Sequence, residues 1–302
     1  MEQRSIAGFK VSLLGLGTSR LASLGAGGSL RDAARLLDAA ADLGVSFIDT
    51  ADTYGSTQCE RWLGELMYKR SYQFVVATKC GLPTADLPWP LRALNQPAKK
   101  VIQRIGPEHY LQPAHVRRSI DASLKRLRRE RIEIYFVHEP PVGVERMDDL
   151  FSVLDAARVD GKIGVYGVSS GNAEIIGAVL DANRCEVVET AVEPLVTSRL
   201  QASLGSVGDS RRVEVVANHV LAGYMRPPVV AAEGAHQAAT LLDKKLNLLT
   251  AEHGVPRANL LIRHAAALHN VRVVLTGTSN PAHLAQNVAA LELPVTSEDL
   301  LA

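Results

Sequence analysis

The chain has 302 residues, of which 47% are apolar, and its formal net charge is +1. It is long enough to bury a large core, and this charge balance excludes the strongly basic surface of a nucleic-acid-binding protein. No apolar run is long enough to span a bilayer and the N-terminus has no apolar signal core, so we expect a cytoplasmic protein without membrane or nucleic-acid partners.

The three cysteines, Cys59, Cys80 and Cys185, are odd in number, and their spacings are typical of neither a disulfide framework nor a zinc site. We therefore expect a reducing compartment and no metal. The basic run at residues 125–129 closes an amphipathic segment and is followed by two glutamates. This pattern predicts a solvated helix end that complements the helix dipole, rather than a phosphate-binding patch.

Short apolar segments alternate with amphipathic ones along the whole chain. Strands are predicted at residues 11–17, 46–51, 74–80, 132–139, 163–169, 187–195, 213–220 and 271–277. Their nearly continuous Val, Ile, Leu and Phe content is typical of parallel strands that are buried on both faces. Helices are predicted at residues 29–43, 58–68, 114–127, 147–159, 173–181, 235–253, 257–269 and 281–291. The first opens at Ser29, a preferred N-cap residue, and closes at Gly44.

Eight strands alternating with helices predict a fold of the α/β class, a (β/α)8 TIM barrel, as one domain over residues 1–302. A doubly wound sheet is the competing architecture, and it requires a glycine-rich dinucleotide turn after its first strand. The segment Gly15-Leu16-Gly17 lacks the third glycine of that motif, and a long loop follows it instead of a helix. We therefore reject the doubly wound sheet.

Two long connections follow strands and therefore lie at the C-terminal mouth of the expected barrel. The longest, residues 81–112, is rich in proline and carries Trp89, which we expect to contact the substrate, although packing of the loop is the alternative. Residues 221–234 form a second mouth loop, and residues 291–302 form a short tail. These lengths suggest a mouth wide enough for a bulky or glycosidic substrate.

Three consecutive strands end in residues that can carry proton chemistry. Asp49, Lys79 and His138 end the second, third and fourth strands, and Tyr54 follows the second strand. Consecutive strands are neighbours in a barrel and catalytic groups lie at their C-terminal ends, so these four side chains are expected to converge.

The residue types suit the protonation of a carbonyl oxygen. A phenol has a pKa near 10, about three units too high for an efficient acid at neutral pH, and we expect the buried ammonium of Lys79 to lower that pKa in Tyr54. Asp49 supplies the counter-charge to Lys79, and His138 orients the carbonyl. Hydride transfer would require a cofactor. A metal site at His138 and Glu139 is the alternative, which opposite orientations on a strand disfavour.

Residues 47–55, Phe-Ile-Asp-Thr-Ala-Asp-Thr-Tyr-Gly, closely resemble the signature of the aldo-keto reductase family, and Thr78-Lys79 and Val137-His138 match two further positions. The resemblance implies that Tyr54 is the general acid, that Lys79 and Asp49 tune it, and that His138 orients the substrate. Residues 8–12 resemble part of the β-hairpin that plugs the barrel bottom in this family.

The resemblance also implies NADPH as the cofactor, with NADH possible, and a small-molecule carbonyl substrate. The implied cofactor-binding residues are Gly17, Thr18, Ser169, Ser170, Glu189, Asn218, Leu221, Gly277, Thr278, Ser279, His283, Gln286 and Asn287. Several depart from the family pattern: Glu189 replaces a usual Gln, Asn218 lies where an aromatic residue is usual, and His283 lies near the usual Arg. Residues 273–302 contain no Lys or Arg, so we expect weak selectivity for NADPH over NADH.

We therefore predict an NAD(P)H-dependent carbonyl reductase that takes hydride from the nicotinamide and a proton from Tyr54. One alternative is a cofactor-binding barrel with a regulatory role. A second alternative keeps the enzyme and changes the reaction to imine or enone reduction or to alcohol oxidation. The sequence leaves the substrate, the direction of the reaction and the oligomeric state open.

Overall fold

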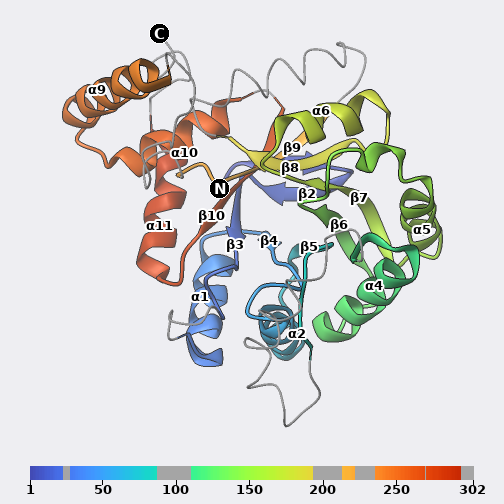
Figure 1. Ribbon diagram of the computed structural model, residues 1–302. Coiled ribbons are helices and arrows are strands. Elements are labelled where there is room, and N and C mark those ends of the chain that lie inside the picture. The colour runs from blue at the N-terminus through green and yellow to red at the C-terminus, as the bar shows by residue number, and fades with distance from the viewer. Residues whose placement is uncertain (23–27, 87–109, 193–212, 222–234, 269, 294–302) are drawn as a thin grey trace.

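Eight parallel strands form a closed barrel in the order β10-β3-β4-β5-β6-β7-β8-β9 (Figure 1). The computed structural model describes residues 1–22, 28–86, 110–192, 213–221, 235–268 and 270–293. The barrel strands are β3 (Leu14–Gly17), β4 (Phe47–Asp49), β5 (Val75–Cys80), β6 (Ile132–His138), β7 (Ile163–Ser169), β8 (Val187–Ala191), β9 (Glu214–Asn218) and β10 (Val271–Gly277). The predicted (β/α)8 barrel is confirmed, and Trp89 lies outside the described residues.

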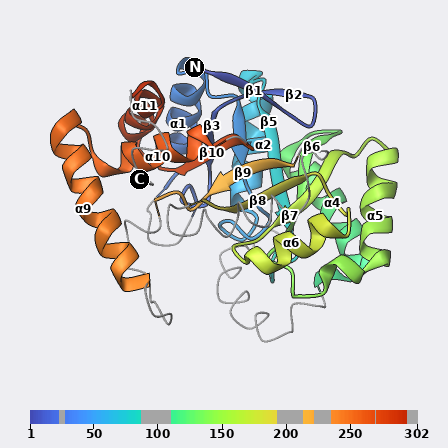
Figure 2. The ribbon, with the colours of Figure 1, turned by 90° about the horizontal axis from the view of Figure 1, so that it is seen from above.

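Helices surround the barrel (Figures 1 and 2). They are α1 (Leu30–Asp42), α2 (Gln58–Arg70), α4 (Pro113–Leu127), α5 (Asp148–Val159), α6 (Ala173–Asp181), α9 (Ala235–His253), α10 (Arg257–Ala267) and α11 (Pro281–Ala289), with the 3-10 turns η3 (Val144–Arg146) and η4 (Ala290–Glu292). Ser29 caps α1 as predicted, in a reciprocal capping box with Asp32. No helix among the described residues is long and apolar enough to cross a membrane.

The predicted strand at residues 11–17 is wrong as a single element. Its first residues belong to an antiparallel hairpin of β1 (Gln3–Ile6) and β2 (Phe9–Ser12), and the rest forms β3 of the barrel. The hairpin turns at Ala7 and Gly8, both of which have positive φ, as a tight two-residue hairpin turn requires. An apolar run that continues from one sheet into another gives no signal of the break between them.

The hairpin closes the N-terminal end of the barrel, as the family resemblance implies. Ile6 and Val11 are fully buried and pack in one apolar cluster with the barrel interior. The interior members of that cluster come from alternate positions of the strands and are Phe47, Ala77, Ile134, Phe136, Val187, Val216, Val273 and Leu275. The lower part of the barrel is therefore a packed core and not a channel.

The same alternation places polar residues at the C-terminal mouth. On β4 the next inward-facing residue after Phe47 is Asp49. The corresponding inward-facing residues at the ends of the other strands are Lys79, His138, Ser169, Glu189, Asn218 and Gly277. The register aligns His138 with Ser169 and Ser169 with Glu189 on neighbouring strands. The strand period of two thus separates an apolar plug from a polar layer directly above it.

The expectation of a solvated basic helix end at residues 125–129 is wrong for Arg126. Its side chain is only 6% exposed and its Nε lies 2.6 Å from the buried carboxylate of Glu60 on α2. Glu60 also accepts from the Thr78 hydroxyl at 2.7 Å, and Arg126 reaches Asp86 at 3.3 Å. Arg126 therefore joins α2, α4 and the segment that leaves β5.

Replacing Arg126 by Met is expected to lower the free energy of unfolding by about 3–5 kcal/mol, because the buried Glu60 carboxylate loses its charged partner. Lys125→Met, at an exposed position of the same helix turn, is the matched control and is expected to change stability little. Chemical denaturation of both variants measures the difference. Equal stabilities would show that the Glu60–Arg126 pair does not hold this part of the fold.

Candidate active site

Lys79 lies at the centre of the polar layer and is fully buried. Its ammonium donates to a carboxylate oxygen of Asp49 and to the backbone oxygen of Thr50, the latter at 3.1 Å. The carboxylate of Glu189 forms a further ion pair with it at 3.1 Å. The predicted Asp49–Lys79 pair is therefore present, and a second carboxylate contacts the same ammonium.

Tyr54 and His138 lie beside this ammonium, so the four predicted proton-transfer residues do converge. Lys79 Nζ is 5.4 Å from the centroid of the Tyr54 ring, and the Tyr54 and His138 rings meet edge to face at 6.2 Å. Tyr54 is placed by a tight turn after β4, in which its N–H donates to Ala51 and the next residue, Gly55, has positive φ. A Cβ at Gly55 would lie 2.6 Å from the Ala22 side chain, so this turn requires glycine.

The predicted lowering of the Tyr54 pKa is wrong for this structure. Burial raises the pKa of the Tyr54 phenol above its usual value, and the ammonium of Lys79 offsets only part of that effect. The carboxylates of Asp49 and Glu189 raise the pKa of Tyr54 further. Desolvation of the phenol and the second nearby anion, Glu189, together outweigh the single nearby cation.

The two carboxylates differ although both are buried. Burial and the neighbouring Glu189 carboxylate raise the pKa of Asp49 well above its usual range, against the effect of Lys79. Burial also acts to raise the pKa of Glu189, but Lys79 and the Asn218 amide together lower it below its usual value. Burial disfavours the charged form of Lys79, yet the two carboxylates raise its pKa, so the ammonium keeps its charge.

Glu189 is also held from the β7 and β9 sides. The Asn218 side-chain amide donates to Glu189 Oε1 at 2.8 Å, and the Ser169 hydroxyl donates to the same oxygen at 3.2 Å. The sequence predicted Glu189 as a cofactor-binding residue and gave no sign of its contact with Lys79, because β5 and β8 are not neighbours and the contact crosses the barrel mouth. Its inward register two positions beyond Val187 is the signal that could have revealed it.

Ser170, which follows Ser169, is fully buried, and its hydroxyl donates to the Glu139 carboxylate at 3.0 Å. Glu139 follows β6 with a positive φ and also accepts from the Gly171 N–H at 3.1 Å. Its carboxylate therefore turns toward the loop after β7 and away from Lys79. Among the described residues, no group of three metal-ligating side chains converges.

The remaining expected cofactor residues lie around β3 and β10. Gly17 pairs with Gly277 on the neighbouring strand, and Thr18 next to them is fully buried and donates to the Asp49 backbone oxygen. A Cβ on either glycine would meet nothing closer than 3.8 Å, so packing does not require glycine at these positions. The paired glycines leave bare backbone at the rim, which fits a ligand that approaches the main chain closely.

Helix α11 begins at this rim. The Asn280 side chain accepts from the Ala282 N–H at 2.9 Å, and Pro281 has no N–H, so two of the first helical positions offer no free amide. The side chains of Ser279, His283 and Gln286 are exposed, and Asn287 is partly buried. Thr278 is buried and its hydroxyl accepts from the Asn280 N–H at 3.0 Å, while Leu221 packs against two apolar clusters rather than facing open space.

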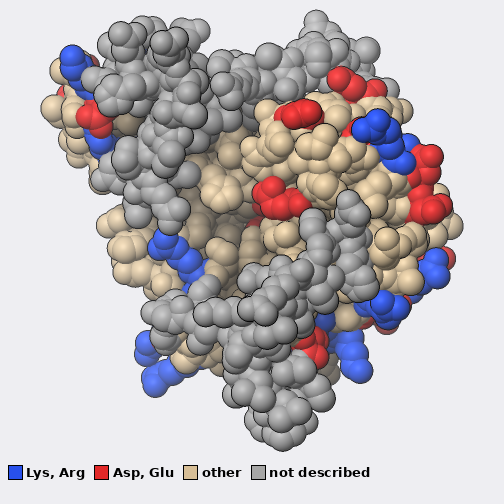
Figure 3. Space-filling model, in the orientation of Figure 1, with Lys and Arg blue, Asp and Glu red and all other residues tan. Residues whose placement is uncertain are grey.

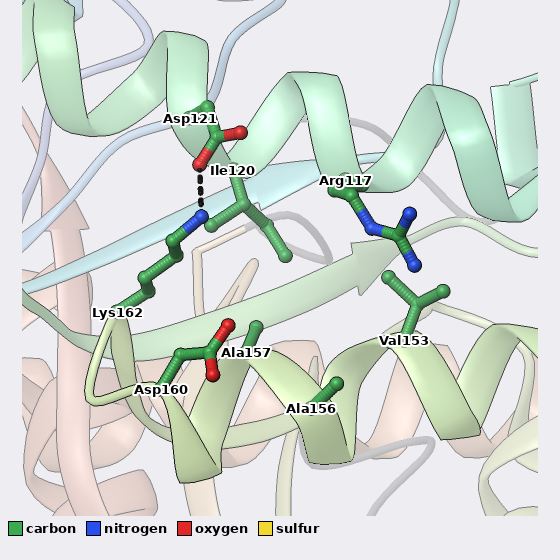
Figure 4. Close-up of a pocket in the computed structure, with 8 residues that line it drawn as sticks. All are labelled: Arg117, Ile120, Asp121, Val153, Ala156, Ala157, Asp160 and Lys162. Atoms are coloured by element: carbon green, nitrogen blue, oxygen red, sulfur yellow. Dashed lines mark hydrogen bonds and ion pairs between the residues drawn. The ribbon is translucent and has the colours of Figure 1, made fainter.

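In the view of Figure 3 the described surface is hollowed near the centre of the barrel face, and uncharged residues line most of that hollow. Most of the Lys, Arg, Asp and Glu side chains in this view lie toward the periphery. A second, small groove of about 40 Å³ lies between α4 and α5 on the outer layer (Figure 4). An ion pair of Lys162 with Asp121 at 2.7 Å spans that groove, and none of the expected site residues lines it.

A model of the aldo/keto reductase family matches residues 13–301. The chain belongs to the aldo/keto reductase family. This result confirms the family resemblance and makes the protein an NAD(P)-dependent oxidoreductase.

Individual relatives agree with that assignment. The chain is 27% identical to the D-threo-aldose 1-dehydrogenase of a Pseudomonas species over 307 residues, which cover 95% of this chain and 92% of the relative. The fold matches the holo form of an aldo-keto reductase from Bacillus halodurans with a TM-score of 0.73, 21% identity and coverage of 99% and 94%. It also matches an aldo-keto reductase from Klebsiella pneumoniae in complex with NADPH, with a TM-score of 0.69, 20% identity and coverage of 99% and 93%.

Replacing Lys79 by Met is expected to destabilise this aldo/keto reductase by about 3–5 kcal/mol at neutral pH, because two buried carboxylates lose their ammonium. Burial then raises the folded-state pKa values of Asp49 and Glu189 above their unfolded values. The loss of stability is therefore expected to shrink as the pH falls and both carboxyls bind protons.

Denaturation of Lys79→Met at several pH values tests this expectation. Lys69→Met is the matched control, because Lys69 forms an exposed pair with Glu65 at 2.6 Å and contributes little to stability. A destabilisation of Lys79→Met that does not depend on pH would contradict the paired-charge description.

Proposed function

We propose that this protein reduces an aldehyde or ketone to an alcohol, and that Tyr54 gives the proton to the carbonyl oxygen. The observation that carries the proposal is the convergence of Tyr54, His138 and the buried Lys79 at the barrel mouth. A phenol, an imidazole and a buried ammonium are the donors needed where negative charge develops on a carbonyl oxygen.

In this proposal each side chain has a distinct task. Tyr54 donates its hydroxyl proton to the carbonyl oxygen as hydride reaches the carbonyl carbon. His138 donates a hydrogen bond that orients the carbonyl beside Tyr54. Lys79 stabilises the phenolate that forms, and Asp49 fixes the ammonium in place. The bound nicotinamide cofactor supplies the hydride, which no side chain can provide.

The rim of the barrel between β3, β7 and β10 suits a dinucleotide. The Gly17–Gly277 pair leaves backbone open to close approach, and Ser169, Ser170 and Asn218 add buried or half-buried polar groups. The NADPH complex of the Klebsiella pneumoniae protein supports a dinucleotide in this fold. We assign Thr278, Ser279, Gln286, Asn287 and His283 to the adenosine and phosphate end, as the resemblance implies.

Alcohol oxidation through the same site is the second candidate, and the D-threo-aldose 1-dehydrogenase relative favours it. In that direction the Tyr54 phenolate accepts the proton that its phenol donates in reduction. A sugar or another polyol is then the substrate class. The same residues serve both directions, so the substrate that is turned over distinguishes them.

Tyr54→Phe is expected to abolish turnover, because it removes the proton donor and keeps the ring that packs beside His138. Cofactor affinity is expected to stay within about threefold of the original, equivalent to ~0.7 kcal/mol. Cofactor oxidation with a panel of aldehydes, and reduction with a panel of aldoses, measure turnover, while a fluorescence titration measures binding. Undiminished activity of Tyr54→Phe would reject the mechanism.

Selectivity for NADPH over NADH is expected to be weak. By the family resemblance, the exposed His283 lies near the position of the arginine that usually holds a 2′-phosphate, and the first turn of α11 offers few free amides. The ratio of kcat/KM for the two cofactors is expected to stay below about tenfold, equivalent to ~1.4 kcal/mol.

The variant His283→Arg tests the cause of this weak selectivity. An arginine can bind a phosphate through two hydrogen bonds, so the variant is expected to raise kcat/KM for NADPH and leave that for NADH unchanged. A strong NADPH preference in the original protein would contradict the expectation.

A further inference from the structure

The Lys79 ammonium has three hydrogens, and three oxygen atoms other than the Tyr54 hydroxyl lie around it. They belong to Asp49, to the Thr50 backbone and to Glu189. Asp49 and Thr50 come from the chain segment just before Tyr54, so they move with its turn. Glu189 comes from β8 on another side of the barrel, and it is the one partner that could be removed without disturbing that turn.

Glu189 is also fixed in a position from which it competes for this ammonium. Asn218 and Ser169 both donate to Oε1 of its carboxylate, and this orients Oε2 toward Lys79 Nζ at 3.1 Å. Its side chain is only 3% exposed, so water does not screen the pair. A carboxylate bound in this way draws the ammonium away from any weaker acceptor such as a phenol oxygen.

We propose that Glu189 is a positioning residue whose carboxylate, ion-paired with Lys79 at 3.1 Å, competes with the Tyr54 hydroxyl for that ammonium. Tyr54 then remains a neutral phenol well into the alkaline range, which keeps its proton available for carbonyl reduction. The reverse reaction needs the phenolate and is confined to high pH. Glu189 thereby sets the pH range in which each direction of the proposed reaction operates.

The charged groups that surround Tyr54 allow this effect to be isolated. Asp49 on β4, Lys79 on β5, His138 on β6 and Glu189 on β8 face it from four strands. The carboxylate of Glu189 acts to raise the pKa of Tyr54, and the ammonium of Lys79 acts to lower it. Replacing Glu189 by a neutral residue removes one anion beside Lys79 and Tyr54, and this change favours the phenolate.

The experiment is a pH titration of Tyr54 by NMR, on protein labelled with ¹³C at the ζ carbon of its seven tyrosines. Tyr54→Phe identifies the Tyr54 signal. In Glu189→Gln the midpoint of Tyr54 ionisation is expected to lie at least about one pH unit below that of the original protein, which is a tenfold increase in the ionisation constant. Glu189→Asp has a shorter side chain with the same charge, and its midpoint is expected between the two.

Glu139→Gln is the matched control. Its carboxylate is at the same mouth but bonds Ser170 and Gly171, so the Tyr54 midpoint is expected to stay as in the original protein. The proposal is overturned if Tyr54 in Glu189→Gln ionises no earlier than in the original protein, or if Glu139→Gln shifts it equally.

An activity measurement adds a second readout, and this part rests on the proposed function. The alkaline limit of carbonyl reduction is expected to move to lower pH in Glu189→Gln together with the NMR midpoint. If no carbonyl is turned over, the NMR titration still decides the role of Glu189, so failure of the proposed function and failure of this inference are separate outcomes. If the Tyr54 midpoint shifts in Glu189→Gln but the alkaline limit of activity does not, the inference that Glu189 sets the pH range of each reaction direction is overturned.

Discussion

One buried ammonium organises the polar layer at the mouth of this barrel. Lys79 is fully buried above an apolar plug, where an unpaired charge would cost several kcal/mol, on the order of the whole stability of a domain. The carboxylates of Asp49 and Glu189 make its burial tolerable, and Thr50 supplies a further acceptor. The position of Tyr54 then follows, because its turn begins directly after the strand that carries Asp49.

The paired charges also explain why the pKa of Tyr54 rises when a single lysine would lower it. A cation shared between two carboxylates presents little net positive charge to a third group. Desolvation of the phenol then prevails, and Tyr54 stays protonated. In the proposed reaction Tyr54 is the acid, and Glu189, which replaces the Gln that is usual in the family, changes the electrostatic surroundings of its hydroxyl.

Features that depend on residues close in the sequence or on neighbouring strands could be predicted from the sequence. The N-cap at Ser29 and the alternation of inward residues could be read from spacing alone, and so could the Asp49–Lys79 pair, since it joins neighbouring strands. Contacts between distant segments could not be predicted in this way. Glu189 reaches Lys79 across the mouth, and Arg126 is buried because Glu60 on another helix needs a partner.

The charge state of Lys79 can be measured directly by ¹⁵N NMR of its side-chain nitrogen. An ammonium signal is expected to persist above pH ~10.4, the ordinary lysine pKa, because Asp49 and Glu189 raise the pKa of Lys79. Its hydrogens are expected to exchange slowly with water. A neutral amine at or below that pH would contradict the account, since neither carboxylate would then be paired with a cation.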